Sequence, residues 1–211
     1  MSYVKEYSKK KDGELQLTPN FKVREFKCND GSDKILIDLE LLALLQLIRD
    51  TMGTPININS GYRTARWNKA VKGASNSYHL YGRAFDCSSN NNYKFVYLAN
   101  GLGIKGIIRY DSFTHIDTRE TIYHANYGSN KFDFESIKIG YPEKLLYRGM
   151  KHYLVGCMQF RLKIKGYDVG NCDWIFGEKT EKALVKFQQN NFTDNKEWDG
   201  ILGAKTWERL F

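Results

Sequence analysis

Three side chains in the first half of the chain have the types and spacing of a metal site. His79 precedes a glycine, Gly82, and Asp86 follows that glycine, while His115 comes later in the chain. A tight turn at the glycine would let His79 and Asp86 converge on one ion. Two imidazoles and one carboxylate suit Zn²⁺ and leave a fourth position for water, as in a catalytic site. Each residue alone is more often a hydrogen-bonded core residue, so the prediction depends on the combination.

The third predicted ligand lies in a segment that alternates polar and apolar residues. The run Thr114-His115-Ile116-Asp117 is typical of a half-buried strand. In such a strand His115 and Asp117 point to one face, while Ile116 points into the core. A sheet is therefore expected to carry the chemistry.

The remaining elements of the first half follow from periodicity and from glycine positions. Apolar residues at three- and four-residue steps predict a core helix over 37–52, which Gly53 ends. A strand over 55–59 would deliver Ser60 and Arg63 to its end. Further helices are expected at 65–71 and 93–100, and further strands at 83–87, 106–110 and 114–118.

The second half contains a short internal repeat. The segment 173–180, DWIFGEKT, recurs 26 residues later as DGILGAKT at 199–206. Each copy reads as a loop that leads through a glycine into the start of a helix. Apolar spacing around Leu162, Phe187 and Trp207 predicts three helices, which two copies would join into one compact bundle.

Length and composition fit two folded domains. The chain has 211 residues, of which 42% are hydrophobic and 14% aromatic, enough to bury real cores. We expect an α+β domain with a central antiparallel sheet at 1–130, a linker at 131–145 and a small three-helix domain at 146–211. The cysteines are far apart and form no CxxC pair, which predicts free and mostly buried thiols.

The sequence contains no apolar segment that would cross or enter a membrane. No stretch approaches the roughly 20 apolar residues of a transmembrane helix, and the polar, basic start lacks the apolar core of a signal peptide. The net charge of +8 fits a polyanionic partner, but no nucleic-acid-binding motif is present. We therefore expect no membrane partner and no nucleic-acid partner, and we expect a monomer.

Residues 20–119 resemble the zinc D-Ala-D-Ala carboxypeptidase and Hedgehog-like peptidase family. The family signature is SGYRT, then N, then SxHxxGxAxD and a later HxD. This chain matches it at Ser60–Thr64, Asn68, Ser77–Asp86 and His115–Asp117. The resemblance implies a Zn²⁺ site at His79, Asp86 and His115 and hydrolysis of an amide bond.

The resemblance also implies roles for neighbouring residues. It places Arg63 near the scissile carbonyl or a substrate carboxylate, and Ser77 can orient a ligand or the substrate. The chain departs from the family at the general base, because many relatives have an acid or a histidine just before the last ligand. The candidates here are Asp117, which could instead orient a ligand, and Asp111 in the preceding turn.

The second half resembles the three-helix peptidoglycan-binding domain of many wall hydrolases. Matching features are the two repeat loops and the Met-Gln and Phe-Gln pairs at 158–159 and 187–188. Most apolar residues of the repeat are expected in the core, Ile175 and Ile201 among them. Trp174 is the expected wall contact, because an aromatic ring can stack on a sugar.

The two resemblances together imply a bacteriolytic enzyme that cuts peptidoglycan stem peptides, as a D,D-carboxypeptidase or an endopeptidase. The domain order and the polar start resemble a phage endolysin, which would be made in the host cytoplasm without a signal peptide and act on the cell wall after release. The main alternative is a non-catalytic wall-binding protein on a degenerate peptidase scaffold, which the unclear identity of the general base supports.

Overall fold

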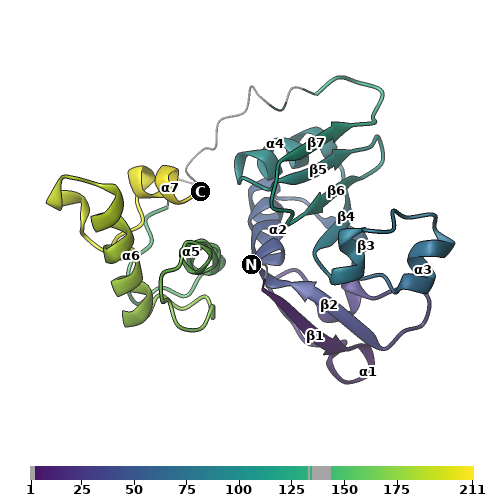
Figure 1. The fold of residues 1–211 in the computed structure, drawn as a ribbon, viewed down its shortest axis with the longest axis horizontal. Coiled ribbons are helices and arrows are strands. Elements are labelled where there is room, and N and C mark those ends of the chain that lie inside the picture. Colours follow the sequence, from purple (N-terminus) through teal and green to yellow (C-terminus); the bar gives the residue numbers. More distant parts are fainter. Residues whose placement is uncertain (1–2, 133, 135–143) are drawn as a thin grey trace. The chain divides into compact units, whose positions relative to one another are not determined.

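The computed structural model describes residues 3–132, 134 and 144–211 (Figure 1). The chain divides into a first unit, Ser2–Lys138, and a second unit, Ile139–Phe211. The linker predicted at 131–145 falls largely on residues 133 and 135–143, which lie outside the described residues. The predicted boundaries 1–130 and 146–211 therefore stay a prediction.

A five-stranded sheet forms the centre of the first unit (Figure 1). Its strand order is β3-β4-β6-β5-β7, and all neighbours are antiparallel except the parallel pair β5 and β7. The strands are β3 Ile56–Ser60, β4 Ala84–Ser89, β5 Gly106–Arg109, β6 Thr114–Asp117 and β7 Tyr123–Asn126. The predicted α+β class is confirmed. The unpredicted strand β7 makes the sheet mixed.

Helix α2, Leu39–Met52, is the main core helix of the first unit. Its start is capped by the Asp38 carboxylate, and its end by Gly53, which adopts the left-handed conformation with φ of 69°. All leucines of this helix and its isoleucine are buried, except Leu39 at the first position, which is half-buried. It packs against helix α4, Asn92–Gly101, which in turn contacts β4, β5 and β6. The two helices thus support the sheet that carries the predicted ligands.

A small two-stranded sheet in the first unit is absent from the sequence prediction. Strand β2, Lys34–Asp38, pairs antiparallel with β1, Val4–Ser8. The predicted helix start at residue 37 is wrong, because Ile37 is a fully buried residue of β2. The apolar run of β2 continues directly into α2, so periodicity alone merges the strand with the helix.

Short helical segments connect the strands of the first unit. Two are α-helices, α1 Lys9–Asp12 and α3 Ala65–Ala70, and two are 3₁₀ helices, η1 Val23–Phe26 and η2 Tyr78–Tyr81. The last of these carries His79 and ends at Gly82.

Three helices form the second unit, as the sequence predicts. They are α5 Tyr153–Ile164, α6 Glu178–Asn191 and α7 Ala204–Leu210, with a 3₁₀ turn η3 at Asn195–Glu197. Their core includes fully buried apolar residues from all three helices and both repeat loops, namely Leu154, Met158, Leu162, Phe176, Leu184, Phe187, Leu202 and Trp207.

A buried glutamine ties the first repeat loop to helix α5. The amide nitrogen of Gln159 donates to Asp173 Oδ1 and Thr180 Oγ1, both at 3.0 Å, and to the carbonyl of Ile175 at 3.1 Å. Its amide oxygen accepts from the backbone N–H of Trp174 at 2.9 Å. Gln159 is 1% exposed, and both ends of its amide are hydrogen-bonded.

The second repeat loop is tied to helix α6 in the same way. The amide nitrogen of Gln188 donates to Asp199 Oδ1, Ile201 O and Thr206 Oγ1 at 2.8, 3.0 and 3.3 Å. Its oxygen accepts from the N–H of Gly200 at 2.9 Å. The repeat in the sequence is therefore a repeat of one hydrogen-bonded arrangement.

The two copies differ at one packed pair of residues. Trp174 has φ of 67°, the left-handed conformation that Gly200 adopts in the second copy with φ of 70°. A Cβ on Gly156 of α5 would lie 2.2 Å from Cδ1 of the Trp174 ring. The residue at the corresponding place in α6 is Val185, whose Cγ2 would lie 3.2 Å from a Cβ on Gly200. The first copy thus pairs a large loop residue, Trp174, with a helix glycine, whereas the second copy pairs a loop glycine with a helix valine.

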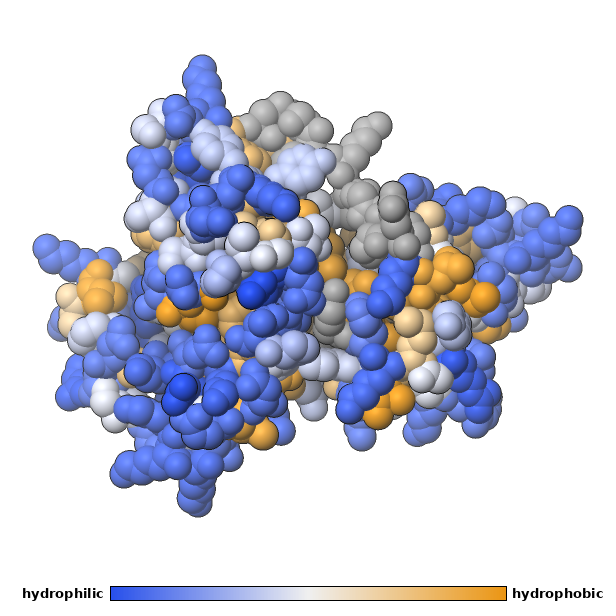
Figure 2. All heavy atoms as spheres, turned by 180° about the vertical axis from the view of Figure 1, so that it is seen from behind, coloured by the Kyte–Doolittle hydropathy of each residue, from blue (hydrophilic) through white to orange (hydrophobic). Residues whose placement is uncertain are grey.

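The surface of each unit that Figure 2 shows is mostly hydrophilic, with hydrophobic side chains in separate patches. One exposed apolar residue corrects the sequence prediction: Ile175 is 45% exposed rather than in the core, and Ile201 is half-buried. The backbone groups of Ile175 bind Gln159 and Asp173, while its side chain stays outside the core. Within the described residues, no helix is long and apolar enough to cross a membrane.

Candidate metal centre and active site

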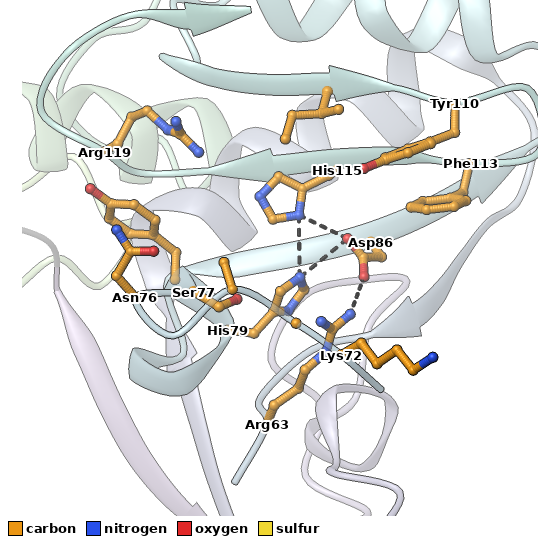
Figure 3. Close-up of a pocket in the computed structure, with 14 residues that line it drawn as sticks. Arg63, Lys72, Asn76, Ser77, His79, Asp86, Tyr110, Phe113, His115 and Arg119 are labelled. Atoms are coloured by element: carbon orange, nitrogen blue, oxygen red, sulfur yellow. Dashed lines mark hydrogen bonds and ion pairs between the residues drawn. The ribbon is translucent and has the colours of Figure 1, made fainter. Parts of the chain in front are cut away.

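The three predicted metal ligands meet at one point of the first unit (Figure 3). The atoms concerned are His79 Nε2, Asp86 Oδ1 and His115 Nδ1, and the group lies within 4.8 Å. Both distances from His79 Nε2 are 3.2 Å, and the distance from His115 Nδ1 to Asp86 Oδ1 is 2.8 Å. A nitrogen, nitrogen and oxygen set of this kind can hold a metal ion.

Strand register and one glycine bring these side chains together. Asp86 on β4 and His115 on β6 are directly paired residues of neighbouring antiparallel strands, so their side chains share a face. His79 reaches them from η2 because Gly82 turns the chain with φ of 67°. A Cβ on Gly82 would lie 2.4 Å from Cβ of Leu36, so this position has no room for a side chain.

Hydrogen bonds on the far side of each imidazole set its tautomer. His79 Nδ1 donates to the carbonyl of Gly61 at 2.6 Å, and His115 Nε2 donates to Asp117 Oδ2 at 2.9 Å. The nitrogens that face each other then carry lone pairs, as does Asp86 Oδ1. Three acceptors at these distances repel one another unless a cation lies between them, either a proton on one imidazole or a metal ion. The residues present therefore fit a metal ion.

Burial and hydrogen bonding set the charges of these groups. Burial lowers the pKa of His79. Burial acts on His115 in the same direction, but hydrogen bonds to Asp117 and Asp86 outweigh it and raise the pKa of His115. Burial disfavours ionisation of Asp86, yet without a metal ion the close contacts with His115 and His79, which can carry a proton, hold its pKa below the usual range. Asp86 is thus a carboxylate, the form that binds metal.

Arg63 contacts the candidate metal ligands directly. Its Nη2 donates to Asp86 Oδ2 at 2.5 Å, and its Nε donates to Ser60 Oγ at 2.8 Å. The guanidinium therefore fixes the Asp86 oxygen that does not face the two histidines. Arg63 also lines the adjoining cavity, where a substrate could reach it. Its contact with substrate stays a prediction.

The two predicted base candidates lie outside the cavity lining. Asp117 is fully buried, and its carboxylate accepts hydrogen bonds from His115 and Arg119. These bonds outweigh the effect of burial and lower the pKa of Asp117 to about 2. Asp111 is exposed and accepts from the backbone and hydroxyl of Ser129 at 2.8 and 3.1 Å. This geometry favours the orienting role of Asp117 over the role of a base.

A cavity of about 440 Å³ opens over the three candidate ligands. Ser77 lies in its wall, and its hydroxyl has no hydrogen-bond partner among the described residues. The rim segment before Ser77 is held by Asn68, which is buried and whose Nδ2 donates to the carbonyl of Ala74 at 2.9 Å. A Cβ on Gly73 would lie 2.2 Å from Oδ1 of Asn68, which explains the small residue there. The Asn68 of the sequence signature thus shapes the cavity.

Several cavity residues are absent from the sequence prediction. Tyr110 and Phe113 stack on each other with ring centroids 4.3 Å apart at one side of the cavity. Arg119 lies at another side, and Lys72 is on the rim with φ of 56°, which is unusual for a residue other than glycine. Arg119 follows the HxD motif by two residues. Its nearness to Asp117 in the sequence is the one signal that could have indicated its place in the cavity wall.

Trp174, the predicted wall contact, lies in the second unit. Its ring packs over Gly156, and the side chain is half-buried. Its left-handed backbone is a conformation that a bulky residue adopts only when its surroundings require it. The structure thus places an aromatic ring at the loop, and its contact with the cell wall stays a prediction.

Comparison with known proteins agrees with this two-unit architecture. Residues 16–117 match the Peptidase M15 family, and residues 152–210 match the putative peptidoglycan binding domain family. A zinc D-Ala-D-Ala carboxypeptidase of Streptomyces albus G is 46% identical over 48 residues, which cover 22% of this chain and 19% of that protein. The matched segment thus spans about a fifth of this relative.

The fold and the site define a protein with a candidate metal centre in an α+β domain, followed by a helical domain. Its first unit contains a match to the Peptidase M15 family, and its second unit contains a match to the putative peptidoglycan binding domain family. The family predicted from the sequence motifs is confirmed.

Proposed function

We propose that this protein is a zinc-dependent peptidase that hydrolyses an amide bond in peptidoglycan stem peptides, as a D,D-carboxypeptidase or an endopeptidase. The observation that carries the proposal is the convergence of three lone-pair atoms, from His79, Asp86 and His115, beside a cavity. The Peptidase M15 match and the zinc carboxypeptidase relative support the choice of metal and reaction.

In this proposal His79, Asp86 and His115 hold Zn²⁺. When bound, the ion polarises the scissile carbonyl and lowers the pKa of a water molecule so that it becomes a nucleophile near neutral pH. The chain fixes the ligands through the Gly61 carbonyl and the Asp117 carboxylate, which hold the two imidazoles in the tautomers that ligation requires.

Arg63 and Ser77 have supporting roles in the same proposal. Two guanidinium nitrogens of Arg63 hold Asp86 and Ser60, and its remaining nitrogen is available to the scissile carbonyl at the cavity wall. Fixed donors of this kind stabilise the negative charge that develops on the oxygen in the transition state. The unpaired Ser77 hydroxyl can orient the substrate backbone.

The second unit supplies attachment to the substrate. The peptidoglycan-binding domain match supports a wall-binding role, and Trp174 is the residue we assign to contact with the sugar strands. A peptidase joined to a wall-binding domain would stay on an insoluble substrate between cuts, because the second contact becomes intramolecular. We therefore propose that the protein acts as a bacteriolytic enzyme of the endolysin type.

Digestion of purified peptidoglycan tests this function. We expect mass spectrometry of the soluble muropeptides to show one new type of cleaved amide bond, and the mass change identifies D-Ala-D-Ala, L-Ala-D-Glu or a cross-bridge as the site. Chelator treatment should abolish cleavage, and added Zn²⁺ should restore it. Binding to the wall without new products and without stoichiometric zinc would instead establish the non-catalytic wall-binding protein.

A further inference from the structure

Arg119 is a cation held rigidly at the wall of the candidate active site. Its Nε donates to Asp117 Oδ1 at 2.8 Å, and its Nη2 donates to Asp117 Oδ2. The guanidinium carbon lies 5.2 Å from the ring centre of Tyr78 and 4.6 Å from that of Tyr123, within the range of cation–π contacts. A carboxylate and two aromatic rings thus fix its position before any ligand arrives.

The guanidinium keeps donors that the protein does not use. Arginine has five N–H groups, and the two contacts with Asp117 engage Nε and Nη2. Nη1 makes no hydrogen bond to any residue that the structure describes. The side chain is 17% exposed and lines the cavity. A rigid, poorly solvated fork with free N–H groups is the arrangement that binds carboxylates in proteins.

The other charges of the cavity also favour an anionic ligand. Arg63, Lys72 and Arg119 line it, and the acidic side chain among the lining residues is Asp86, which is already paired with Arg63. Figure 3 places Arg119 on one side of the three candidate ligands, away from the stacked Tyr110 and Phe113. A peptide lying across the cavity would therefore meet a cation on one side and aromatic rings on the other.

We propose that Arg119 binds a free carboxylate of the substrate, next to the scissile bond, and so determines which stem peptides the enzyme accepts. The inference rests on the proposed peptidase function and assigns to Arg119 the carboxylate recognition that the motif alone would give to Arg63. Two carboxylates of stem peptides fit this role: the C-terminal carboxylate of the last alanine and the α-carboxylate of the D-glutamyl residue.

Paired substrates test the proposal with the full-length, zinc-loaded protein. The parent substrate is a stem pentapeptide in which both carboxylates are free. Two matched peptides differ from it by one amide each, at the C-terminus or at the glutamyl α-carboxylate. We expect amidation at one of these two positions to lower kcat/KM of the wild type by about 10- to 100-fold, mainly through KM. The position that shows this preference identifies the source of the carboxylate.

The variant Arg119→Gln should abolish that preference. Because Arg119 also holds Asp117, the variant would lower turnover of both substrates if its role were structural, and the acid-to-amide ratio would then stay unchanged. Arg83→Gln is the matched control, since Arg83 packs on the same Tyr78 ring, also at 5.2 Å, but is not part of the cavity lining. We expect the ratio to stay at its wild-type value in this control.

Each result has a defined meaning. A wild type that cleaves acid and amide peptides equally, or an Arg119→Gln variant that keeps the preference, overturns the proposal. If no stem peptide is cleaved, the proposed peptidase function fails, and calorimetric binding of the same peptides still tests Arg119. Tighter binding of the free acid by the wild type than by Arg119→Gln would support carboxylate recognition, and equal binding would overturn it.

Discussion

The two units of this protein each bury a small group of polar side chains, and the two groups differ in one respect. In the second unit, the amide nitrogens of Gln159 and Gln188 donate hydrogen bonds and their amide oxygens accept them. In the first unit, His79, Asp86 and His115 turn three acceptor atoms toward one point. The glutamines are complete within the protein, whereas the three ligands require a cation.

A count of hydrogen-bond donors and acceptors therefore distinguishes a buried polar group that stabilises the fold from one that binds a ligand. A buried polar network with all partners in place stabilises one fold. A network whose surroundings force acceptors to face one another stores repulsion that a ligand relieves.

The largest effect is expected for His79→Ala. The substitution removes one of three ligands and leaves too few donors for a tight zinc site. We expect loss of stoichiometric zinc after dialysis, measured by elemental analysis, and loss of peptidoglycan hydrolysis to background. The matched control is His124→Ala, because His124 lies in β7 outside the ligand group; among the described residues its ring hydrogen-bonds the carbonyl of Ile104 and stacks on Phe134. One zinc ion per chain in the His79→Ala protein would refute this ligand assignment.

Gln188→Leu should destabilise the second unit without impairing the first. The substitution leaves Asp199, Thr206 and two backbone groups without their buried partner, which should cost about 3 kcal/mol in the free energy of unfolding. Urea denaturation measures this change, and hydrolysis of a soluble stem peptide should persist. The neighbouring exposed residue supplies the control Gln189→Leu, for which a change within about 0.5 kcal/mol is expected. Equal effects of the two substitutions would contradict the structural role.

Asp117→Asn distinguishes an orienting carboxylate from a general base. Loss of the charged partner of His115 should weaken zinc binding by about 10- to 100-fold, measured by competition with a chelating dye. Near-normal turnover at saturating zinc would exclude the base role. If kcat stays low when zinc and substrate are both saturating, Asp117 has a role in the chemical step besides holding His115 and Arg119. The same assay on Asp111→Asn tests the other candidate, for which the exposed position predicts little change.

The smallest expected effect concerns the residue pair that distinguishes the two repeat copies. Gly156→Val should cost about 1 to 3 kcal/mol, because its side chain would collide with the Trp174 ring. The double variant with Trp174→Gly recreates the pair found in the second copy and should recover most of that stability. Urea denaturation of both single variants and the double variant gives the coupling energy. Additive effects would show that the two residues are independent.

The sequence predicted the elements that have a clear hydrophobic periodicity or a residue, such as glycine, that marks their end. Gly53 marked the end of α2, and the alternation in 114–117 marked β6. Strand β2 was merged with the following helix because both are apolar, and strand β7, with its four residues Tyr123–Asn126, carries too few apolar positions to be recognised. These errors arise where a local pattern is shared by two structures and only tertiary pairing decides.

The candidate site was predictable to the extent that its residues lie in motifs. His79, Asp86 and His115 could be predicted because glycine and strand spacing constrain them, and the structure brings them together. Arg119 and Tyr110 could not, because their cavity positions depend on where a strand ends and on which rings pack nearby. Ile175 was misplaced for a related reason: hydropathy predicts burial, whereas the fold of the repeat loop leaves this side chain 45% exposed.

The exchange between Gly156 with Trp174 and Val185 with Gly200 has a practical consequence for redesign of the second unit. At position 174 the absence of a side chain on Gly156 leaves the space that the Trp174 ring fills, so other side chains could be placed there by selection. Position 200 has less room, since Cγ2 of Val185 lies 3.2 Å from where a Cβ would stand, whereas the left-handed backbone is common to both positions. One half of the duplication can be diversified while the other half remains the constant framework.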